Sequence, residues 1–419
     1  MAAGSGGTTN VADVPATDPP ASKPSVSTLL VTLTGRDRPG VTSAVFDTLA
    51  RYPVEVLDVE QVVLRGRLVL GILVTAPRDV GRLRQAVEKT GRGLGMYVET
   101  EDGAGDNRPR RSGRSHVTVL GQPLRPKAVA AIAGRISDTG ANIDRIVRIA
   151  RYPVVAIEMD VSGVDPDLLR QALAIEAAAT QVDVAVQPAG LYRRAKRLVV
   201  LDVDSTLIQG EVIEMLAAHA GCEEEVARVT AEAMRGELDF AESLRRRVAL
   251  LAGVDAGALS EVRCEVRLTP GARTLTRTLR RLGYQIGVVS GGFTQVVEPL
   301  AAELGIDFVA ANRLEVADGR LTGRVEGPIV DRPGKAEALR GFAAAAGVPL
   351  SQTVAIGDGA NDLDMLAAAG LGVAFNAKPV VREAADTAVS VPYLDAIIYL
   401  LGITRDEVDA ADAETTETA

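Results

Sequence analysis

Short apolar runs that end in polar residues recur through the C-terminal half of this 419-residue chain, and they constrain its fold more than any other feature. The runs are RLVVLDVD, QIGVVSGG, TVAIGDG and LGVAF, and stretches of helical periodicity separate them. This alternation is typical of a parallel sheet covered by helices on both faces. We therefore predict a doubly wound α/β domain over residues 191–405. The helical stretch 210–268 exceeds a normal crossover, and we expect it to form an inserted cap.

The N-terminal half contains two segments of similar size, 25–102 and 115–190, which repeat one order of elements. In each segment the pattern predicts strand, helix, strand, strand, helix, strand, which is the ferredoxin-like βαββαβ layout. Three stretches lack apolar periodicity. We interpret 1–24 as a disordered tail, 103–114 as a linker and 406–419 as a disordered acidic tail.

Composition excludes several classes of protein. The net charge of −9 and the pI of about 5.1 disfavour a nucleic-acid partner. No apolar run approaches the length of a membrane span, and no signal peptide is visible. Two cysteines cannot form a disulfide framework, so we expect a cytoplasmic location. With only two histidines, any catalytic chemistry must rest on carboxylates, lysine and serine.

Polar side chains gather at the predicted strand ends, which parallel strands bring to one edge of a sheet, where ligands bind. The first run ends in Asp202 and Asp204, the second in Ser290, Gly291 and Gly292, and the third in Asp358, with Asn361 and Asp362 close behind. Converging carboxylates would repel one another unless a cation neutralised them, and oxygen ligands suit Mg²⁺. The sequence therefore predicts a Mg²⁺ site.

Such a site could transfer a phosphoryl group. Asp202 could attack phosphorus, and Asp204, which points the same way along an extended chain, could act as general acid and base. Ser290 offers donors to phosphoryl oxygens, and Lys335 would offset negative charge. Each motif alone also has a structural explanation, as a helix cap or a polar turn. Their combination, in this order and at strand ends, favours a phosphatase.

DVDST, VVSGG, Lys335 and GDGANDLDML resemble the four motifs of the haloacid dehalogenase superfamily, over about residues 197–401. The resemblance implies a haloacid dehalogenase-like sheet, with Asp202 as nucleophile and Asp204 as general acid/base. It implies that Mg²⁺ is held by Asp202, the Asp204 main-chain carbonyl and Asp358, with Asn361 and Asp362 in support. It also implies that Ser290 and Lys335 hold the phosphoryl group.

A rival motif lies in the predicted cap. Cys222 and Arg228 have the Cys-x₅-Arg spacing of cysteine-dependent phosphatases. Those enzymes need a Gly-rich loop whose N–H groups surround the phosphate, whereas the intervening residues here are the acidic, helix-prone EEEVA. We expect this segment to repel a phosphate.

The cap should set the substrate. An acidic residue near a phosphate site, such as Glu211, favours a substrate with an ammonium group, and an arginine of the cap could bind a carboxylate. The cap resembles that of phosphoserine phosphatases, which implies the substrate O-phosphoserine and the last step of serine biosynthesis. On that resemblance Glu211 faces the amino group and Arg247 faces the carboxylate. Met234 and Phe240 form an apolar wall, and Gly292 lies near the substrate. Alternatively, Glu211 is only an acidic residue in the first turn of a helix, where it suits the helix dipole, and Arg247 belongs to a solvated arginine face.

The two N-terminal repeats resemble ACT domains, which often bind amino acids and pair across subunits. The first carries GRDRPG, in which Asp37 and Gly40 belong to the loop that contributes to the ligand site in that family. A carboxylate could sit at the following helix N-terminus. The second repeat has GQPLRPK there and lacks a counterpart of Asp37. We expect a homodimer with L-serine or another amino acid as effector; the alternative is a pure dimerisation role.

Two other functions stay open from the sequence. The chain could be a different aspartate-nucleophile phosphatase, or a phosphotransferase that passes the phosphoryl group to an alcohol such as homoserine. It could also be an amino-acid sensor with a vestigial catalytic half. The intact Asp202, Asp204, Ser290, Lys335 and Asp358 argue against the sensor. No membrane partner is expected.

Overall fold

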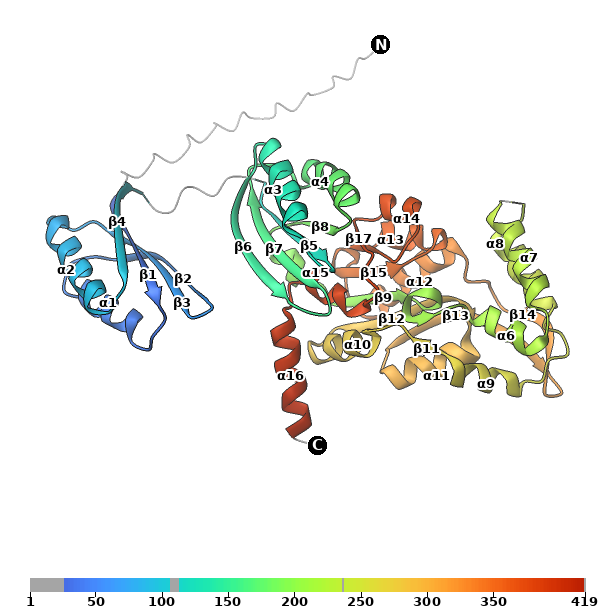
Figure 1. Ribbon diagram of the computed structural model, residues 1–419. Helices are drawn as coiled ribbons and strands as arrows, with labels where there is room; N and C mark the ends of the chain where they lie inside the picture. Colours follow the sequence, from blue (N-terminus) through green and yellow to red (C-terminus); the bar gives the residue numbers. More distant parts are fainter. Residues whose placement is uncertain (1–25, 106–112, 236, 418–419) are drawn as a thin grey trace, which may run out of the picture. The chain divides into compact units, whose positions relative to one another are not determined.

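The computed structural model of the protein describes residues 26–105, 113–235 and 237–417, which fall into two compact units divided after residue 110 (Figure 1). The predicted tail 1–24 and residues 106–112 of the predicted linker lie outside the described residues. The second repeat and the α/β domain belong to one unit, 111–419, although the sequence predicted them as separate domains.

The first unit is the first βαββαβ repeat. Its elements are β1 (Ser27–Arg36), α1 (Val41–Leu49), β2 (Val56–Leu64), β3 (Arg67–Thr75), α2 (Val80–Gly93) and β4 (Tyr97–Ala104). The antiparallel sheet has the order β2-β3-β1-β4, as a ferredoxin-like fold requires. Alternate residues Leu29, Val31 and Leu33 of β1 are fully buried in the core that this sheet forms with α1 and α2. Strand β4 extends to Ala104, so the first residues of the predicted linker are strand instead.

The second repeat has the same topology. Its elements are β5 (Ser115–Gly121), α3 (Pro126–Asp138), β6 (Asn142–Ala150), β7 (Val155–Ser162), α4 (Pro166–Thr180) and β8 (Asp183–Pro188), with the sheet order β6-β7-β5-β8. Val117 and Val119 of β5 are buried with the two helices of the repeat. Leu120, Ala156 and Ala185 belong instead to the core of the α/β domain, because the repeat is packed against that domain.

The α/β domain has a seven-stranded sheet of order β14-β13-β12-β9-β15-β16-β17, parallel except for β14. Its strands are β9 (Leu198–Asp202), β12 (Gln285–Phe293), β13 (Phe308–Ala317), β14 (Arg320–Glu326), β15 (Thr353–Gly357), β16 (Gly372–Phe375) and β17 (Thr387–Val389). In β9, Val199 and Leu201 pack in one core with α10 (Ala272–Arg281) and α11 (Thr294–Leu304). Leu198 and Val200 pack in another with α12 (Arg332–Ala345) and α13 (Leu363–Ala368). The predicted doubly wound sheet is confirmed.

The predicted insertion forms a helical cap. It contains α6 (Val212–Ala220), α7 (Glu223–Met234), α8 (Phe240–Ala249) and α9 (Gly257–Glu265). Two short strands, β10 (Ile208–Gln209) and β11 (Arg267–Leu268), pair where the chain leaves and re-enters the α/β domain. Figure 1 shows α7 and α8 at the end of this unit that is remote from the second repeat.

Side chains of the second repeat, and of the short helix that follows it, donate to or accept from the backbone of the C-terminal part of the α/β domain. Gln187 donates to the carbonyl of Leu400 in α15 (Ile397–Leu400) at 2.8 Å. Arg193, in the short helix α5 (Leu191–Arg194), donates to the same carbonyl at 3.1 Å. The carboxylate of Asp183 accepts from the N–H of Ser390, just after β17, at 2.6 Å. The two domains are therefore joined by backbone-directed hydrogen bonds as well as by a shared core.

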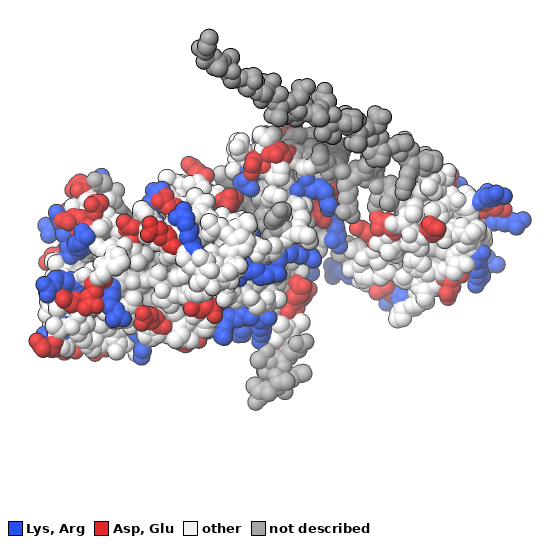
Figure 2. All heavy atoms as spheres, turned by 180° about the vertical axis from the view of Figure 1, so that it is seen from behind, with Lys and Arg blue, Asp and Glu red and all other residues white. Residues whose placement is uncertain are grey.

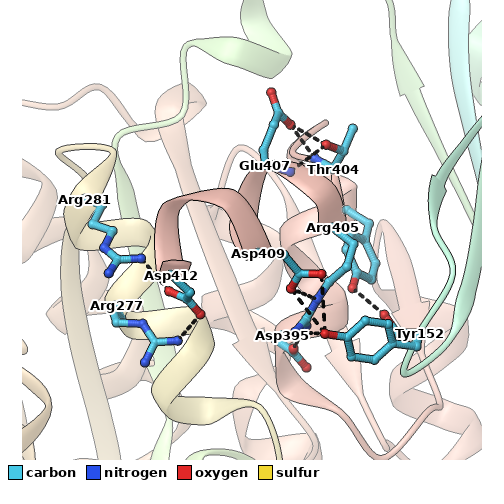
Figure 3. A network of polar contacts seen from close by, with 10 residues as sticks. Tyr152, Arg277, Arg281, Asp395, Thr404, Arg405, Glu407, Asp409 and Asp412 are labelled. Atoms are coloured by element: carbon cyan, nitrogen blue, oxygen red, sulfur yellow. Dashed lines mark hydrogen bonds and ion pairs between the residues drawn. The ribbon is translucent and has the colours of Figure 1, made fainter. Parts of the chain in front are cut away.

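The predicted disorder of the acidic tail 406–419 is wrong for its described residues, because α16 (Arg405–Glu417) is a helix. Arg405 lies over the ring of Tyr152, 4.4 Å from its centroid, and donates to Asp395 at 3.1 Å (Figure 3). Asp412 forms ion pairs of 2.5 Å with Arg277 and Arg281 of α10. The acidic helix is ordered because its charges meet partners on elements distant in sequence.

The surface has no dominant charge on the face drawn in Figure 2, where basic and acidic side chains are interspersed over the described residues. None of the helices in the described ranges is both long enough and apolar enough to cross a membrane.

Candidate active site

A buried lysine joins two carboxylates at the carboxyl end of the sheet. Asp202 is the last residue of β9, and Asp362 ends a 3₁₀ turn (Ala360–Asp362) after β15. The Nζ of Lys335, from the first turn of α12, lies 2.7 Å from the Oδ1 atoms of both. All three side chains are at most 5% exposed. Burial alone would lower the pKa of Lys335, but the two carboxylates raise it above its ordinary value, so Lys335 is a cation here.

Three carboxylates share this edge. Asp202, Asp358 and Asp362 each offer an oxygen, and these oxygens lie within 4.8 Å of one another. Burial and the charge of Asp362 raise the pKa of Asp202, and they raise that of Asp358 to about 6. One lysine cannot neutralise three carboxylates, two of them buried and that of Asp358 half-buried, and carboxylate oxygens are the ligands of hard divalent cations. The residues present therefore fit a metal ion.

Asp204 lies beside this cluster on the irregular turn that follows β9. Its Oδ1 accepts from the N–H of Val212 at 2.9 Å, and its Oδ2 accepts from the hydroxyl of Ser290 at 3.0 Å. Burial raises the pKa of Asp204, against the opposing effect of these two hydrogen bonds. A carboxyl group with a raised pKa is suited to donate a proton.

The glycines after Ser290 leave little room for a side chain. A Cβ on Gly292 would lie 2.9 Å from Ser290 Oγ and 3.0 Å from Asp204 Oδ2. The N–H of Gly292 donates to Ser290 Oγ at 2.7 Å. A Cβ on Gly291 would lie 3.0 Å from Cζ of Phe240, at the start of cap helix α8. The predicted Ser-Gly-Gly loop thus contacts both Asp204 and the cap.

Two opposite charges of the cap face the same carboxylates. Burial, followed by the charges of Asp204 and Glu214, raises the pKa of Glu211 to about 7, and Arg247 opposes this shift. Arg247 is 8% exposed, and burial lowers its pKa although Glu211 and Asp204 favour its charged form. Arg247 is buried and Glu211 is half-buried, and Glu211 makes no capping hydrogen bond to α6. Both side chains therefore interact electrostatically with Asp204 while at least partly shielded from water.

The remaining predicted residues have varied positions. Asn361 is half-buried in the turn that carries Asp362. The side chain of Met234 lies outside the described part of the structure. Asp37 and Gly40 lie in the exposed loop between β1 and α1, in the other compact unit. There the N–H of Asp37 donates to the carbonyl of Gly66 at 2.8 Å.

The rival Cys-x₅-Arg motif does not form a phosphate loop. Cys222 immediately precedes α7, and the residues between it and Arg228 are helical. Burial and the charges of Glu225 and Glu223 raise the pKa of the Cys222 thiol, which opposes formation of the thiolate nucleophile. Arg228 is exposed on the helix.

Sequence reasoning missed two residues that support the site. Thr206 donates from its hydroxyl to Asp358 at 3.0 Å, and its place in DVDST was the available signal. Asn312, 1% exposed in β13, donates to the carbonyl of Gly291 and accepts from the N–H of Val330, both at 2.8 Å. A lone asparagine in the run FVAANRLEV gave no comparable signal.

Comparisons with known proteins agree with this geometry. Residues 199–367 match the family of haloacid dehalogenase-like hydrolases, and residues 27–101 and 114–187 each match an ACT domain family. A phosphoserine phosphatase of Streptomyces coelicolor is 69% identical over 92% of this chain and 95% of its own. The phosphoserine phosphatase SerB2 of Mycobacterium tuberculosis is 56% identical over 93% of this chain and 97% of its own.

A solved structure extends the likeness to the fold. The probable phosphoserine phosphatase of Vibrio cholerae, in unliganded form, is 36% identical with a TM-score of 0.56, and the match covers 68% of this chain and 86% of that one. Since the curated relatives match nearly from end to end, the chain belongs to the phosphoserine phosphatase family, with a haloacid dehalogenase-like hydrolase domain preceded by two ACT domains.

Proposed function

We propose that this protein hydrolyses O-phosphoserine to L-serine and phosphate, with Mg²⁺ and an aspartyl-phosphate intermediate, as the last step of serine biosynthesis. The observation that carries the proposal is the placement of Glu211 and Arg247 beside Asp204. A half-buried glutamate and a buried arginine match the ammonium and the carboxylate of an amino acid, next to the residues suited to attack its phosphate.

Asp202 is the proposed nucleophile. Its Oδ1 accepts from Lys335 and from the N–H of Val203, at 2.7 and 2.8 Å, so Oδ2 is the oxygen left free of these bonds for attack. Attack forms the bond from Oδ2 to phosphorus and breaks the ester bond to the serine oxygen. Lys335 and the donors at Ser290 and Gly292 hold the phosphoryl oxygens.

Asp204 is the proposed general acid and base. It gives a proton to the departing serine oxygen, then takes one from the water that attacks the aspartyl-phosphate, which releases phosphate and restores Asp202. Mg²⁺, held by Asp202, the main-chain carbonyl of Asp204 and Asp358 with support from Asn361 and Asp362, would supply the charge that stabilises the transferring group.

The first ACT domain is the proposed effector site, with L-serine as ligand and a homodimer as the assembly. Gly40 has φ of 90°, and no side chain caps the N-terminus of α1, so backbone N–H groups there are available to a carboxylate. Residues 1–110 have their own hydrophobic core and can be studied separately. Calorimetry should show L-serine binding that Asp37→Ala weakens, and no binding at millimolar concentration would contradict the proposal.

Phosphate release tests the catalytic proposal. We expect turnover of O-phosphoserine with Mg²⁺, none with chelator, and weaker turnover of O-phosphothreonine and of a neutral phosphate ester. Asp202→Asn should abolish turnover while the protein stays folded. Asp318→Asn, in the exposed turn between β13 and β14, is the matched control and should be fully active. An active Asp202→Asn variant would exclude the covalent mechanism.

A further inference from the structure

One hydroxyl group in the cap is buried without a hydrogen-bond partner. Ser243 lies in α8 and is 1% exposed, and its Oγ has no partner. Among the described residues 210–235 and 237–268 it is the one buried side-chain N or O atom in this condition. A buried serine in a helix can bond the carbonyl one turn back, as Thr230 does to Val226 in α7 at 3.0 Å. Ser243 has no such bond, so its hydroxyl remains available.

The position of Ser243 on α8 points it toward the active site. Phe240, Ser243 and Arg247 are spaced i, i+3 and i+7, which places them on one face of the helix. At one end of this face, Phe240 packs against Gly291 of the Ser-Gly-Gly loop. At the other end, Arg247 interacts electrostatically with Glu211 and Asp204. Ser243 lies between two residues that both face the catalytic groups.

Ser243 is also adjacent to the guanidinium of Arg247. The Nε of Arg247 donates to the backbone carbonyl of Ser243, at 3.4 Å. The guanidinium is thereby drawn back over the turn that carries the serine. An anion that pairs with the outer nitrogens of Arg247 would be bound beside the Ser243 hydroxyl.

We propose that Ser243 is a specificity-determining residue whose hydroxyl donates a hydrogen bond to the substrate carboxylate that Arg247 pairs with. This inference rests on the proposed function, because it assumes a phospho-amino acid at the site. Its chemistry is simple: a carboxylate has acceptor positions left over after it pairs with a guanidinium, and Ser243 has an unused donor. The unpartnered hydroxyl is then explained as a group that substrate satisfies, rather than as a packing defect.

Ser243→Ala is the decisive variant, because it removes only the hydroxyl. We expect KM for O-phosphoserine to rise roughly tenfold or more, as for the loss of a hydrogen bond to a charged group, with kcat little changed. KM for O-phosphoethanolamine, which keeps phosphate and ammonium but lacks the carboxylate, should stay within about twofold. Where that ester is not turned over, its inhibition constant replaces KM. Thr230→Val, which removes a cap hydroxyl already bonded within its own helix, should change neither constant.

Three outcomes would overturn the inference: an unchanged KM for O-phosphoserine, an equal rise for both esters, or an equal rise in Thr230→Val. The melting temperature of ligand-free Ser243→Ala should be equal to or above that of the unmodified protein, because an unsatisfied polar group has been removed. The same assay tests the proposed function and the role of Ser243 separately. No Mg²⁺-dependent hydrolysis of O-phosphoserine by the unmodified protein would overturn the proposed function itself, whereas an active enzyme insensitive to Ser243→Ala would overturn only the role of Ser243.

Discussion

Replacing Lys335 with methionine tests how the buried carboxylates are held in the absence of metal. Lys335 is the shared partner of Asp202 and Asp362, at 2.7 Å from each, and all three side chains are inaccessible to solvent. Methionine keeps most of the volume but leaves two acidic groups without their cation. Breaking a buried ion pair by removing one partner costs about 3–5 kcal/mol, so we expect the free energy of unfolding of the α/β domain to fall by that amount in chelator.

A double-mutant cycle assigns this loss to the charge pair rather than to packing. Asp362→Asn alone leaves Lys335 paired with Asp202 and should cost less than Lys335→Met. The double variant should be about 1–2 kcal/mol more stable than the sum of the single losses predicts, because groups in contact are not additive.

Amide hydrogen exchange of β9 and β15 across a urea series, with EDTA present, reports this domain separately from residues 1–110. Lys378→Met removes an exposed lysine and should stay within about 0.5 kcal/mol of the unmodified protein. A Lys335→Met loss below about 1 kcal/mol, with additive single effects, would refute the reasoning.

The cap and the glycine loop give three further predictions. Arg247→Ala should raise KM for O-phosphoserine by roughly thirtyfold or more and leave KM for an aryl phosphate unchanged; equal effects would show that the arginine does not bind the carboxylate. Because burial raises the pKa of Glu211 to about 7, and only its charged form pairs with ammonium, the calorimetric affinity for L-serine of a fragment that starts at residue 111, which lacks the first ACT domain, should fall as the pH drops below about 7. Glu211→Gln should remove that dependence. Gly292→Ala should lower kcat, since its Cβ would meet Ser290 Oγ, whereas Gly341→Ala in α12, with open space around it, should not.

The sheet and the catalytic cluster were predictable because their signals are local. A parallel strand buried on both faces needs an apolar run, and its carboxyl end needs a change to polar residues, so DVDST and GDGAND marked both the strands and the site. Prediction of the cap residues also required the resemblance of the cap to that of phosphoserine phosphatases. Nothing in the spacing of Glu211 and Arg247 shows that both interact with Asp204, which depends on how the cap packs.

The features that could not be predicted from the sequence depend on partners that are distant along the chain. Helix α16 has an acidic, weakly apolar sequence, and the arginines that pair with Asp412 precede it by 131 and 135 residues. Strand β4 extends into a Gly- and Asp-rich segment because Ala104 is in register with Ser27 of β1, and backbone pairing there does not depend on side-chain propensity. The role of Asn312 is defined only by its two tertiary hydrogen bonds.

The shared core between the second ACT domain and the hydrolase domain decides where this chain can be cut. Leu120, Val154, Ala156 and Ala185 are at most 1% exposed, and all belong to the cluster built around the catalytic sheet. A fragment that starts at residue 191 would expose the apolar surface that they cover and lose the hydrogen bond from Gln187 to Leu400, and it should aggregate. A fragment that starts at residue 111 keeps the second ACT domain, which covers that apolar surface. The smallest stable and monodisperse catalytic fragment of this protein should therefore include the second ACT domain as a structural part.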